Sequence, residues 1–262
     1  MKRSLFSTTI LFGVIAATTF AFVGLSLAYE LIAAWPMDEG SGDEMSDLSG
    51  NGHDGEFFGN PEWANGKFGK GIQFHGAPDH IEVPDPDHEL TPEHITLVCW
   101  VNLDDDVDTH AIMEQYDWAA GKGAYCLRTG GKQLAFYTQN GASDAGASVG
   151  GAVKAGEWFH AAATFDGDVM RTYVNGELVA SFDVTVFTAL LPSDKSLSFG
   201  VRGDSKDTHW MMGTLDEAAI FNEALSEEEI KNIMDNGLQA TVLAVSTSGK
   251  LATTWGRMKN DK

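Results

Sequence analysis

GEWFHAAATFDGDVMRTYVNGELVASF, residues 156–182, is the stretch that decides the fold. Two pairs in it, Asp166-Gly167 and Asn175-Gly176, are typical of tight hairpin turns, and runs rich in β-branched and aromatic residues flank each pair. The residues between the pairs alternate between two faces, with Met170, Thr172 and Val174 on one and Arg171 and Tyr173 on the other. We therefore predict three consecutive antiparallel strands joined by two type I′ turns, which indicates an all-β fold.

Length and charge narrow the class of protein. The chain has 262 residues, of which 43% are hydrophobic and 29 are glycine, which suits one β-sandwich domain with many turns. Its 38 Asp and Glu residues outnumber 17 Lys and Arg residues, giving a formal net charge of −21. Because like charges repel, we do not expect nucleic acid or an anionic membrane surface as a partner. Calcium, cationic surfaces and neutral glycans stay open as partners.

The N-terminus has the pattern of an export signal. Residues 1–3 are basic, residues 5–25 are mostly apolar, and Ser26-Leu27-Ala28 places small residues before a cleavage point ahead of Tyr29. An uncleaved membrane anchor is the alternative, because the apolar run is long enough to span a bilayer. We predict a signal peptide over residues 1–28, a secreted or periplasmic protein with no membrane insertion after cleavage, a domain over residues 29–238, and a C-terminal tail over residues 239–262.

Several glycine-rich and aromatic motifs follow one another along the chain. They are residues 35–42 (WPMDEGSG), 47–55 (DLSGNGHDG), 66–76 (GKFGKGIQFHG), 95–101 (ITLVCWV), 156–175 and 213–229 (GTLDEAAIFNEALSEEE). In this order they resemble the motifs of laminin-G-like domains of the concanavalin A-like jelly-roll family. The resemblance runs from about Leu31 to Leu238. It implies a two-sheet antiparallel jelly-roll β-sandwich whose first and last strands lie together, with a short helix after the closing strand. Ser226 followed by three glutamates is typical of an N-capped helix, so we predict that this helix starts at Ser226 and ends near Asn236-Gly237.

An acidic, glycine-rich segment over residues 37–59 is either a solvated loop or a calcium site, because Ca²⁺ binds carboxylate, amide and main-chain oxygens. The resemblance implies a calcium ion where this loop meets the closing strand. Carried over residue by residue, its side-chain ligands are Asp38, Asp47, Asn51 and Asp216, with main-chain carbonyls near Gly52 and His53. The alternative is that Asp216 caps a turn and Asp38 is solvated.

Cys99 and Cys126 are the only cysteines, and both fall in apolar strand runs. In an exported chain an even pair is typical of a disulfide, although each residue also fits as a small buried hydrophobe. Two interpretations therefore stay open: a Cys99–Cys126 disulfide, or two separate buried thiols.

Catalytic signatures are weak. Residues 146–150 match G-x-S-x-G, but residues 139–151 are rich in Gly, Ala and Ser and are predicted to form a loop, whereas a nucleophile elbow needs a strand before it and a helix after it. No E-x-D-x-x-E strand is present, and Asp216 and Glu217 are expected on opposite faces of a strand. The histidines lack zinc-site spacing, and His160 is expected to be a hydrogen-bonded core residue. We predict that the protein is not an enzyme and holds no transition metal.

Saccharides are held by flat aromatic rings with a few fixed polar groups. Most tryptophans occupy motif positions where core packing explains them, but three aromatic residues fall in loops and two arginines lie nearby in sequence. The predicted ligand-binding residues are Tyr116, Trp118, Arg128, Arg202 and Trp210. In the alternative, these rings fold back over the sandwich.

The sequence therefore predicts an exported, non-catalytic module that binds carbohydrate or another extracellular ligand, with calcium as the expected metal. Two alternatives stay open: a structural or adhesive envelope protein, and a carbohydrate-active hydrolase of the same fold. Fold similarity does not decide among them.

Overall fold

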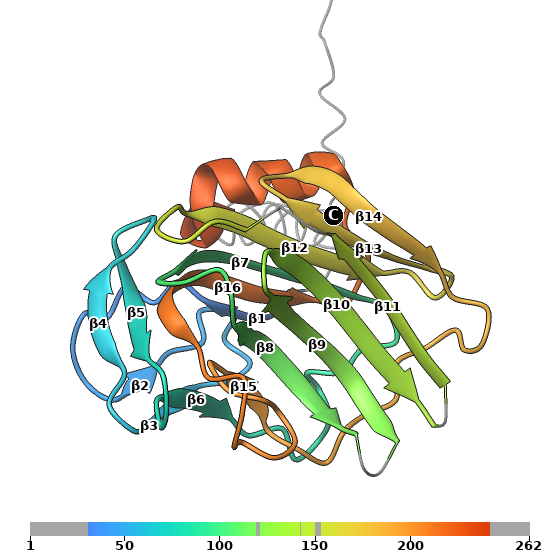
Figure 1. Cartoon of the computed structure of the whole chain (residues 1–262), viewed down its shortest axis with the longest axis horizontal. Helices are drawn as coiled ribbons and strands as arrows, with labels where there is room; N and C mark the ends of the chain where they lie inside the picture. The colour runs from blue at the N-terminus through green and yellow to red at the C-terminus, as the bar shows by residue number, and fades with distance from the viewer. Residues whose placement is uncertain (1–30, 119–120, 142, 150–152, 242–262) are drawn as a thin grey trace, which may run out of the picture.

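The computed structural model describes residues 31–118, 121–141, 143–149 and 153–241, which form two antiparallel β-sheets packed face to face (Figure 1). The prediction of a two-sheet jelly-roll sandwich is confirmed. The predicted signal peptide and residues 242–262 of the predicted tail lie outside the described residues.

Eight strands form the first sheet. In spatial order they are β14 (Glu177–Asp183), β13 (Val169–Val174), β12 (Phe159–Phe165), β7 (Ile95–Leu103), β16 (Met212–Phe221), β5 (Lys70–His75) and β4 (Glu62–Asn65), and β1 (Leu31–Trp35) also pairs with β16. The pairing of β1 with β16 places the first and last strands together, as the resemblance implied.

Eight more strands form the second sheet. In spatial order they are β11 (Ser143–Val149), β10 (Gln133–Asn140), β9 (Lys122–Gly130), β8 (Thr109–Asp117), β15 (Leu197–Phe199), β6 (His80–Val83), β3 (Gly55–Phe58) and β2 (Glu44–Met45). Strands β8 to β11 lie side by side in front of the first sheet (Figure 1).

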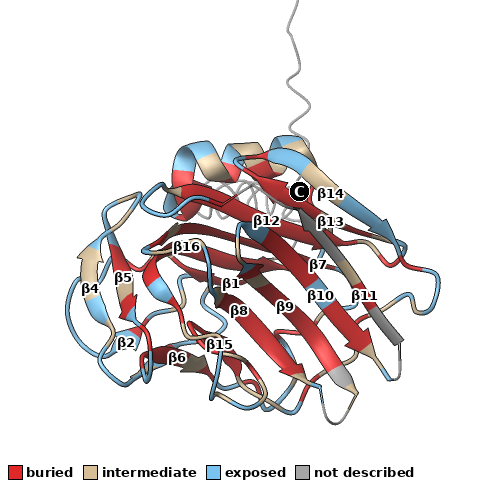
Figure 2. Ribbon diagram, in the orientation of Figure 1, coloured by how far each residue is buried: buried red, intermediate tan, exposed pale blue. Residues whose placement is uncertain are grey.

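The hydrophobic core fills the space between the sheets. Alternate residues of each strand point into it, as the period of two in a β-strand requires. Strand β7, for example, contributes Leu97, Cys99 and Val101, which are fully buried. Trp35 of β1 packs edge to face on Phe199 of β15, with ring centroids 5.2 Å apart, and so joins the two sheets. Buried residues run along the central strands of both sheets (Figure 2).

A helix over residues 227–241 covers the outer face of the first sheet (Figure 1). Ile230 and Ile233 pack there with Val98 and Ala162. Ser226 and Glu229 form a reciprocal capping box, in which the Ser226 backbone N–H donates to the Glu229 carboxylate at 2.7 Å and the Glu229 N–H donates to Ser226 Oγ at 3.3 Å. The predicted helix start is thus confirmed. No helix in the described ranges combines the length and apolar composition needed to span a bilayer.

The meander of β12, β13 and β14 is confirmed, and its two turns differ. Asn175 and Gly176 have φ values of 51° and 77°, which suits a type I′ turn. At the other turn, Asp166 is not in the positive-φ region, so the predicted type I′ turn there is wrong. Its carboxylate instead accepts the N–H groups of Asp168 and Val169, at 3.0 and 2.7 Å, and closes a longer turn.

Residues 143–149 are a strand, so the predicted loop over residues 139–151 is wrong there. This segment pairs along its length with β10, which supplies the backbone hydrogen bonds that its own sequence does not signal. A Cβ on Gly146 would overlap the ring of Tyr137, so the small residue is needed for the close approach of the two strands.

Cys99 and Cys126 are free, buried thiols, so the structure agrees with the alternative of two small buried residues and not with the disulfide. Cys99 belongs to the core between the sheets, on a strand of the first sheet. Cys126 lies in β9 of the second sheet and lines a hollow on the outer face of that sheet. Cys99 thus points into the space between the sheets, whereas Cys126 points out of that space on the far face of the second sheet.

Candidate functional site

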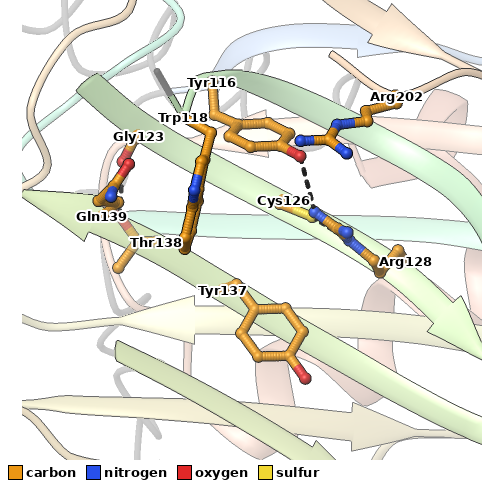
Figure 3. Close-up of a pocket in the computed structure, with 9 residues that line it drawn as sticks. All are labelled: Tyr116, Trp118, Gly123, Cys126, Arg128, Tyr137, Thr138, Gln139 and Arg202. Atoms are coloured by element: carbon orange, nitrogen blue, oxygen red, sulfur yellow. Dashed lines mark hydrogen bonds between the residues drawn. The ribbon is translucent and has the colours of Figure 1, made fainter. Parts of the chain in front are cut away.

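A hollow of about 270 Å³ opens on the outer face of the second sheet (Figure 3). Its lining residues come from β8, β9, β10 and two loops: Tyr116, Trp118, Gly123, Cys126, Arg128, Tyr137, Thr138, Gln139 and Arg202. Three aromatic rings and two arginines thus gather at one place, from segments far apart in the sequence.

The register of three strands explains this gathering. Gly123 of β9 lies between Tyr116 of β8 and Gln139 of β10. In the next row, Cys126 lies between Glu114 and Tyr137. Side chains in such rows share one face of the sheet.

Small residues on the central strand make the depression. Gly123 has no side chain, and a Cβ there would come within 2.6 Å of the Cβ of Gln139. Cys126 is small and 2% exposed. Large rings on the flanking strands therefore form the walls, while β9 forms the floor.

The three rings differ in exposure. Trp118, in the turn after β8, is 49% exposed, and Tyr137 is 42% exposed. Tyr116 is only 4% exposed, and the guanidinium groups of Arg128 and Arg202 lie 5.6 and 5.9 Å from the centroid of its ring. Exposed rings beside a hollow are suited to stacking against a flat ligand.

Arg128 is held from below by a buried carboxylate. Its Nε lies 3.0 Å from Oε1 of Glu114, which is fully buried, and the Cys126 thiol donates to the same oxygen at 3.0 Å. Burial raises the pKa of Glu114, although the Arg128 charge opposes this shift. Arg128 Nη2 donates to the Tyr116 hydroxyl at 3.2 Å. Burial also raises the pKa of Tyr116 to about 12, so this hydroxyl keeps its proton at neutral pH and can donate it.

Arg202 lies on the loop after β15 and is fixed by Asp204, whose Oδ1 accepts the Arg202 Nε proton at 2.6 Å. His209 completes this side, with Nδ1 3.4 Å from Arg128 Nη1. Burial, followed by the nearby charges of Arg128 and Arg202, lowers the pKa of His209. A neutral His209 adds no third positive charge.

Gln139 marks the other end of the hollow. It is 8% exposed, and its buried Oε1 has no hydrogen-bond partner among the described residues. In Figure 3, Gln139 and Gly123 lie on one side of Trp118, and Tyr116, Arg128 and Arg202 lie on the other. An unpaired buried acceptor costs about 1–3 kcal/mol, which a ligand hydroxyl would recover.

Four of the five predicted ligand-binding residues line this hollow: Tyr116, Trp118, Arg128 and Arg202. Trp210 does not. Its ring packs edge to face on His80, at 5.8 Å. Sequence reasoning missed Tyr137 and Gln139, although their alternation with the core residues Leu134 and Phe136 places them on the outer face of the sheet.

The predicted calcium residues fall into two groups. In the first, Asp47 binds its own loop: its carboxylate accepts the N–H groups of Ala34, Ser49 and His53 at 3.0, 2.9 and 3.1 Å. Asn51 donates from Nδ2 to the Ile32 carbonyl at 2.8 Å. These bonds fasten the loop to β1.

In the second group, Asp38 Oδ1 accepts the Lys70 N–H at 2.8 Å, and Asp216 Oδ2 accepts the N–H groups of Lys67 and Phe68 at 2.8 and 2.9 Å. Asp216 sits at a β-bulge and is fully buried, and its Oδ1 has no partner among the described residues. Burial raises the pKa of Asp216 to about 8 and that of the adjacent Glu217 to about 7, and the charge of Asp38 adds to the second shift.

The fit to calcium is therefore partial. Within the described ranges, no three Asp, Glu, His or Cys side chains converge closely enough to hold a metal ion. The Asp47 carboxylate accepts N–H groups from its loop and from β1, and Asn51 donates from Nδ2 to the Ile32 carbonyl. Asp216, in contrast, has a carboxylate oxygen without a partner among the described residues. A calcium ion beside Asp216 would need main-chain carbonyls as further ligands, which Ca²⁺ accepts. Calcium binding stays a prediction.

His160 is buried, as expected, but it is not hydrogen bonded through Nδ1 to any described residue. Its ring packs edge to face on Trp100 at 5.3 Å, and burial lowers its pKa to about 3.

Two packed antiparallel sheets with a ring-lined hollow on an outer face define a lectin-like jelly-roll domain. The family model for the concanavalin A-like lectin/glucanases superfamily matches residues 75–231, more than half of the chain, so the chain belongs to this superfamily. Pappalysin-1 from Mus musculus is 28% identical over 109 residues, which cover 40% of this chain and 7% of that protein.

Solved structures with the same fold include receptor-binding domains of botulinum neurotoxins. The binding domain of neurotoxin DC in complex with SialylT superposes with a TM-score of 0.63 at 14% identity, covering 79% of this chain and 51% of that chain. The same domain in complex with rat synaptotagmin II has a TM-score of 0.64 at 15% identity, with the same coverage of 79% and 51%. The chain thus spans about half the length of these structures, and the likeness shows the fold alone.

Proposed function

We propose that the protein is a non-catalytic binding module that holds a saccharide in the hollow of β8, β9 and β10. One observation carries this proposal: two exposed rings, Trp118 and Tyr137, flank a depression that also holds fixed polar groups. Flat rings cover the apolar faces of sugars, and fixed polar groups bind their hydroxyls.

The polar groups are arranged before any ligand arrives. Glu114 and Tyr116 hold Arg128, and Asp204 holds Arg202. Pre-ordered side chains lose little conformational entropy on binding, which favours affinity.

A binding role is better supported than hydrolysis. Glycosidases place two carboxylates on either side of the bond that they cleave. The described residues that line the hollow include no Asp or Glu. Glu114, the carboxylate beneath it, is fully buried and paired with Arg128.

Export is part of the proposal, since the leader-like residues 1–28 suit a secreted or periplasmic protein that meets extracellular glycans. An adhesive envelope protein would share this location, and the ring-lined hollow favours a ligand-binding role over a purely structural one.

The test is a glycan array probed with the parent protein and two variants. Trp118→Ala removes a ring of the hollow, and Phe182→Ala removes a ring of similar exposure, 45% against 49%, from β14 of the other sheet. We expect Trp118→Ala to weaken binding tenfold or more, a loss of about 1.4 kcal/mol, and Phe182→Ala to bind like the parent. Equal binding by all three proteins would refute the assignment of the site.

A further inference from the structure

If the hollow is the saccharide site proposed above, its two ends select the ligand further. We propose that it takes an acidic saccharide, one that carries a carboxylate or sulfate group together with free hydroxyls, with the anionic group at Arg128 and Arg202 and a hydroxyl at Gln139.

The composition of the lining is the first argument. Across the whole chain, 38 Asp and Glu residues face 17 Lys and Arg residues. The described lining reverses this balance, with two arginines and no carboxylate. Two cationic side chains at one place in an otherwise acidic chain favour a ligand that carries a negative charge.

Hydrogen-bond donors converge at one end. The guanidinium groups of Arg128 and Arg202 both lie within 6 Å of the centroid of Tyr116, and the Tyr116 hydroxyl accepts from Arg128 and retains its own proton. Arginine forks match the geometry of carboxylate and sulfate oxygens, and charge-assisted bonds are about twice as strong as neutral ones.

Both arginines already have carboxylate partners, but these partners approach from one edge only. Glu114 binds the Nε side of Arg128 from beneath the sheet surface. Asp204 binds Arg202 through Nε and Nη2, at 2.6 and 3.2 Å. Among the described residues, Nη1 of Arg202 has no hydrogen-bond partner, and Nη1 of Arg128 has only the 3.4 Å contact with His209, so both nitrogens can donate to another acceptor.

The opposite end supplies an acceptor. Gln139 Oε1 is buried and unpaired among the described residues, so it favours a ligand group that donates, such as a sugar hydroxyl. The two ends thus differ in chemistry, with Trp118 between them (Figure 3). A ligand with an anionic group at one end and hydroxyls at the other would bind in one orientation.

The experiment uses an array of matched pairs, in which each uronate or sulfated oligosaccharide stands beside its neutral parent and each uronate also beside its methyl ester. The protein variants are Arg202→Gln and Lys154→Gln. Arg202→Gln removes a positive charge from the hollow. Lys154→Gln is the control, because it removes a positive charge from an exposed ion pair with Glu157 that does not line the hollow. Thermal unfolding of each variant establishes that it is folded.

We expect acidic oligosaccharides to bind at least tenfold more tightly than their neutral parents, and esterification of the bound uronates to remove that gain. Arg202→Gln should reduce the preference, and Lys154→Gln should keep it. The uronate and sulfate arms show which anionic group is used. Equal binding of acidic and neutral partners, lost in Trp118→Ala, overturns this inference and leaves the saccharide site standing. Binding of no glycan overturns both.

Discussion

Asp216 makes the stability of the fold depend on pH in an unusual direction. Its carboxyl is fully buried at a β-bulge, and burial raises its pKa from 3.8 to about 8. Between these two values the folded state keeps a proton that the unfolded state has released. Stability is therefore highest at low pH in this window and falls as the pH rises through the folded-state pKa.

The magnitude follows from the linkage relation. One proton held only by the folded state changes the free energy of unfolding by about 1.4 kcal/mol per pH unit. From pH 5 to pH 7 the parent should lose about 2.7 kcal/mol through Asp216 alone. For a domain of this size the loss corresponds to a fall of about 5–11 °C in the unfolding midpoint.

Asp216→Asn tests this effect, because an amide can still accept the N–H groups of Lys67 and Phe68 but does not ionise. Other groups also titrate, including His160, so the quantity to measure is the difference between variant and parent. In a buffer with a chelator, the stability advantage of Asp216→Asn should widen by about 3 kcal/mol between pH 5 and pH 7. Asp183→Asn, at an exposed position, is the control.

Denaturant unfolding at several pH values measures the difference. Parallel curves for the parent and Asp216→Asn would refute the reasoning, because they would mean that the buried carboxyl does not hold its proton.

The same two proteins test calcium binding. At pH 8, calcium should raise the unfolding midpoint of the parent relative to chelator and leave the midpoint of Asp216→Asn unchanged. Identical parent midpoints in calcium and chelator would contradict calcium binding at this bulge.

Two further variants probe the hollow. Glu114→Ala leaves Arg128 without its buried partner and should cost about 3–5 kcal/mol, seen as a midpoint lowered by about 6–20 °C in thermal unfolding; a change under 3 °C would contradict a stabilising ion pair. Gly146→Ala pushes a methyl group into the ring of Tyr137 and should weaken glycan binding. Gly130→Ala is the control and should bind like the parent, because the nearest atom to its new methyl group is 3.9 Å away. Equal glycan binding by both variants would contradict a role for the Tyr137 ring.

Local chemistry made much of the fold predictable. The Asn175-Gly176 turn and the alternation in β13 depend on a few neighbouring residues, and both are as predicted apart from the type of the Asp166 turn. Strand β11 was missed because its Gly, Ala and Ser residues carry no hydrophobic pattern, and only pairing with β10 makes it a strand. Gly146 in this strand must be small because the ring of Tyr137 on β10 lies against it. A contact with another strand cannot be read from the residues next to Gly146 in the sequence.

The site was predictable in part for a similar reason. Trp118 and Tyr116 were found because the core pattern did not explain them, whereas Trp210 satisfied the same criterion and instead packs on His80. Loop position alone does not show which way a ring turns. The sequence left a Cys99–Cys126 disulfide open because it shows that both residues lie in strands, whereas the sheet and face that each strand occupies are set by long-range pairing.

The central claim is that ligand binds on β8, β9 and β10, and amide hydrogen exchange tests it most directly. The protein would be compared with and without the array glycan that binds most strongly. We predict slower exchange around Tyr116, Cys126 and Gln139, with no change in β13 and β14 on the other sheet. Protection confined to another place, such as the hollow beside Asn51 and Glu89, would contradict the account.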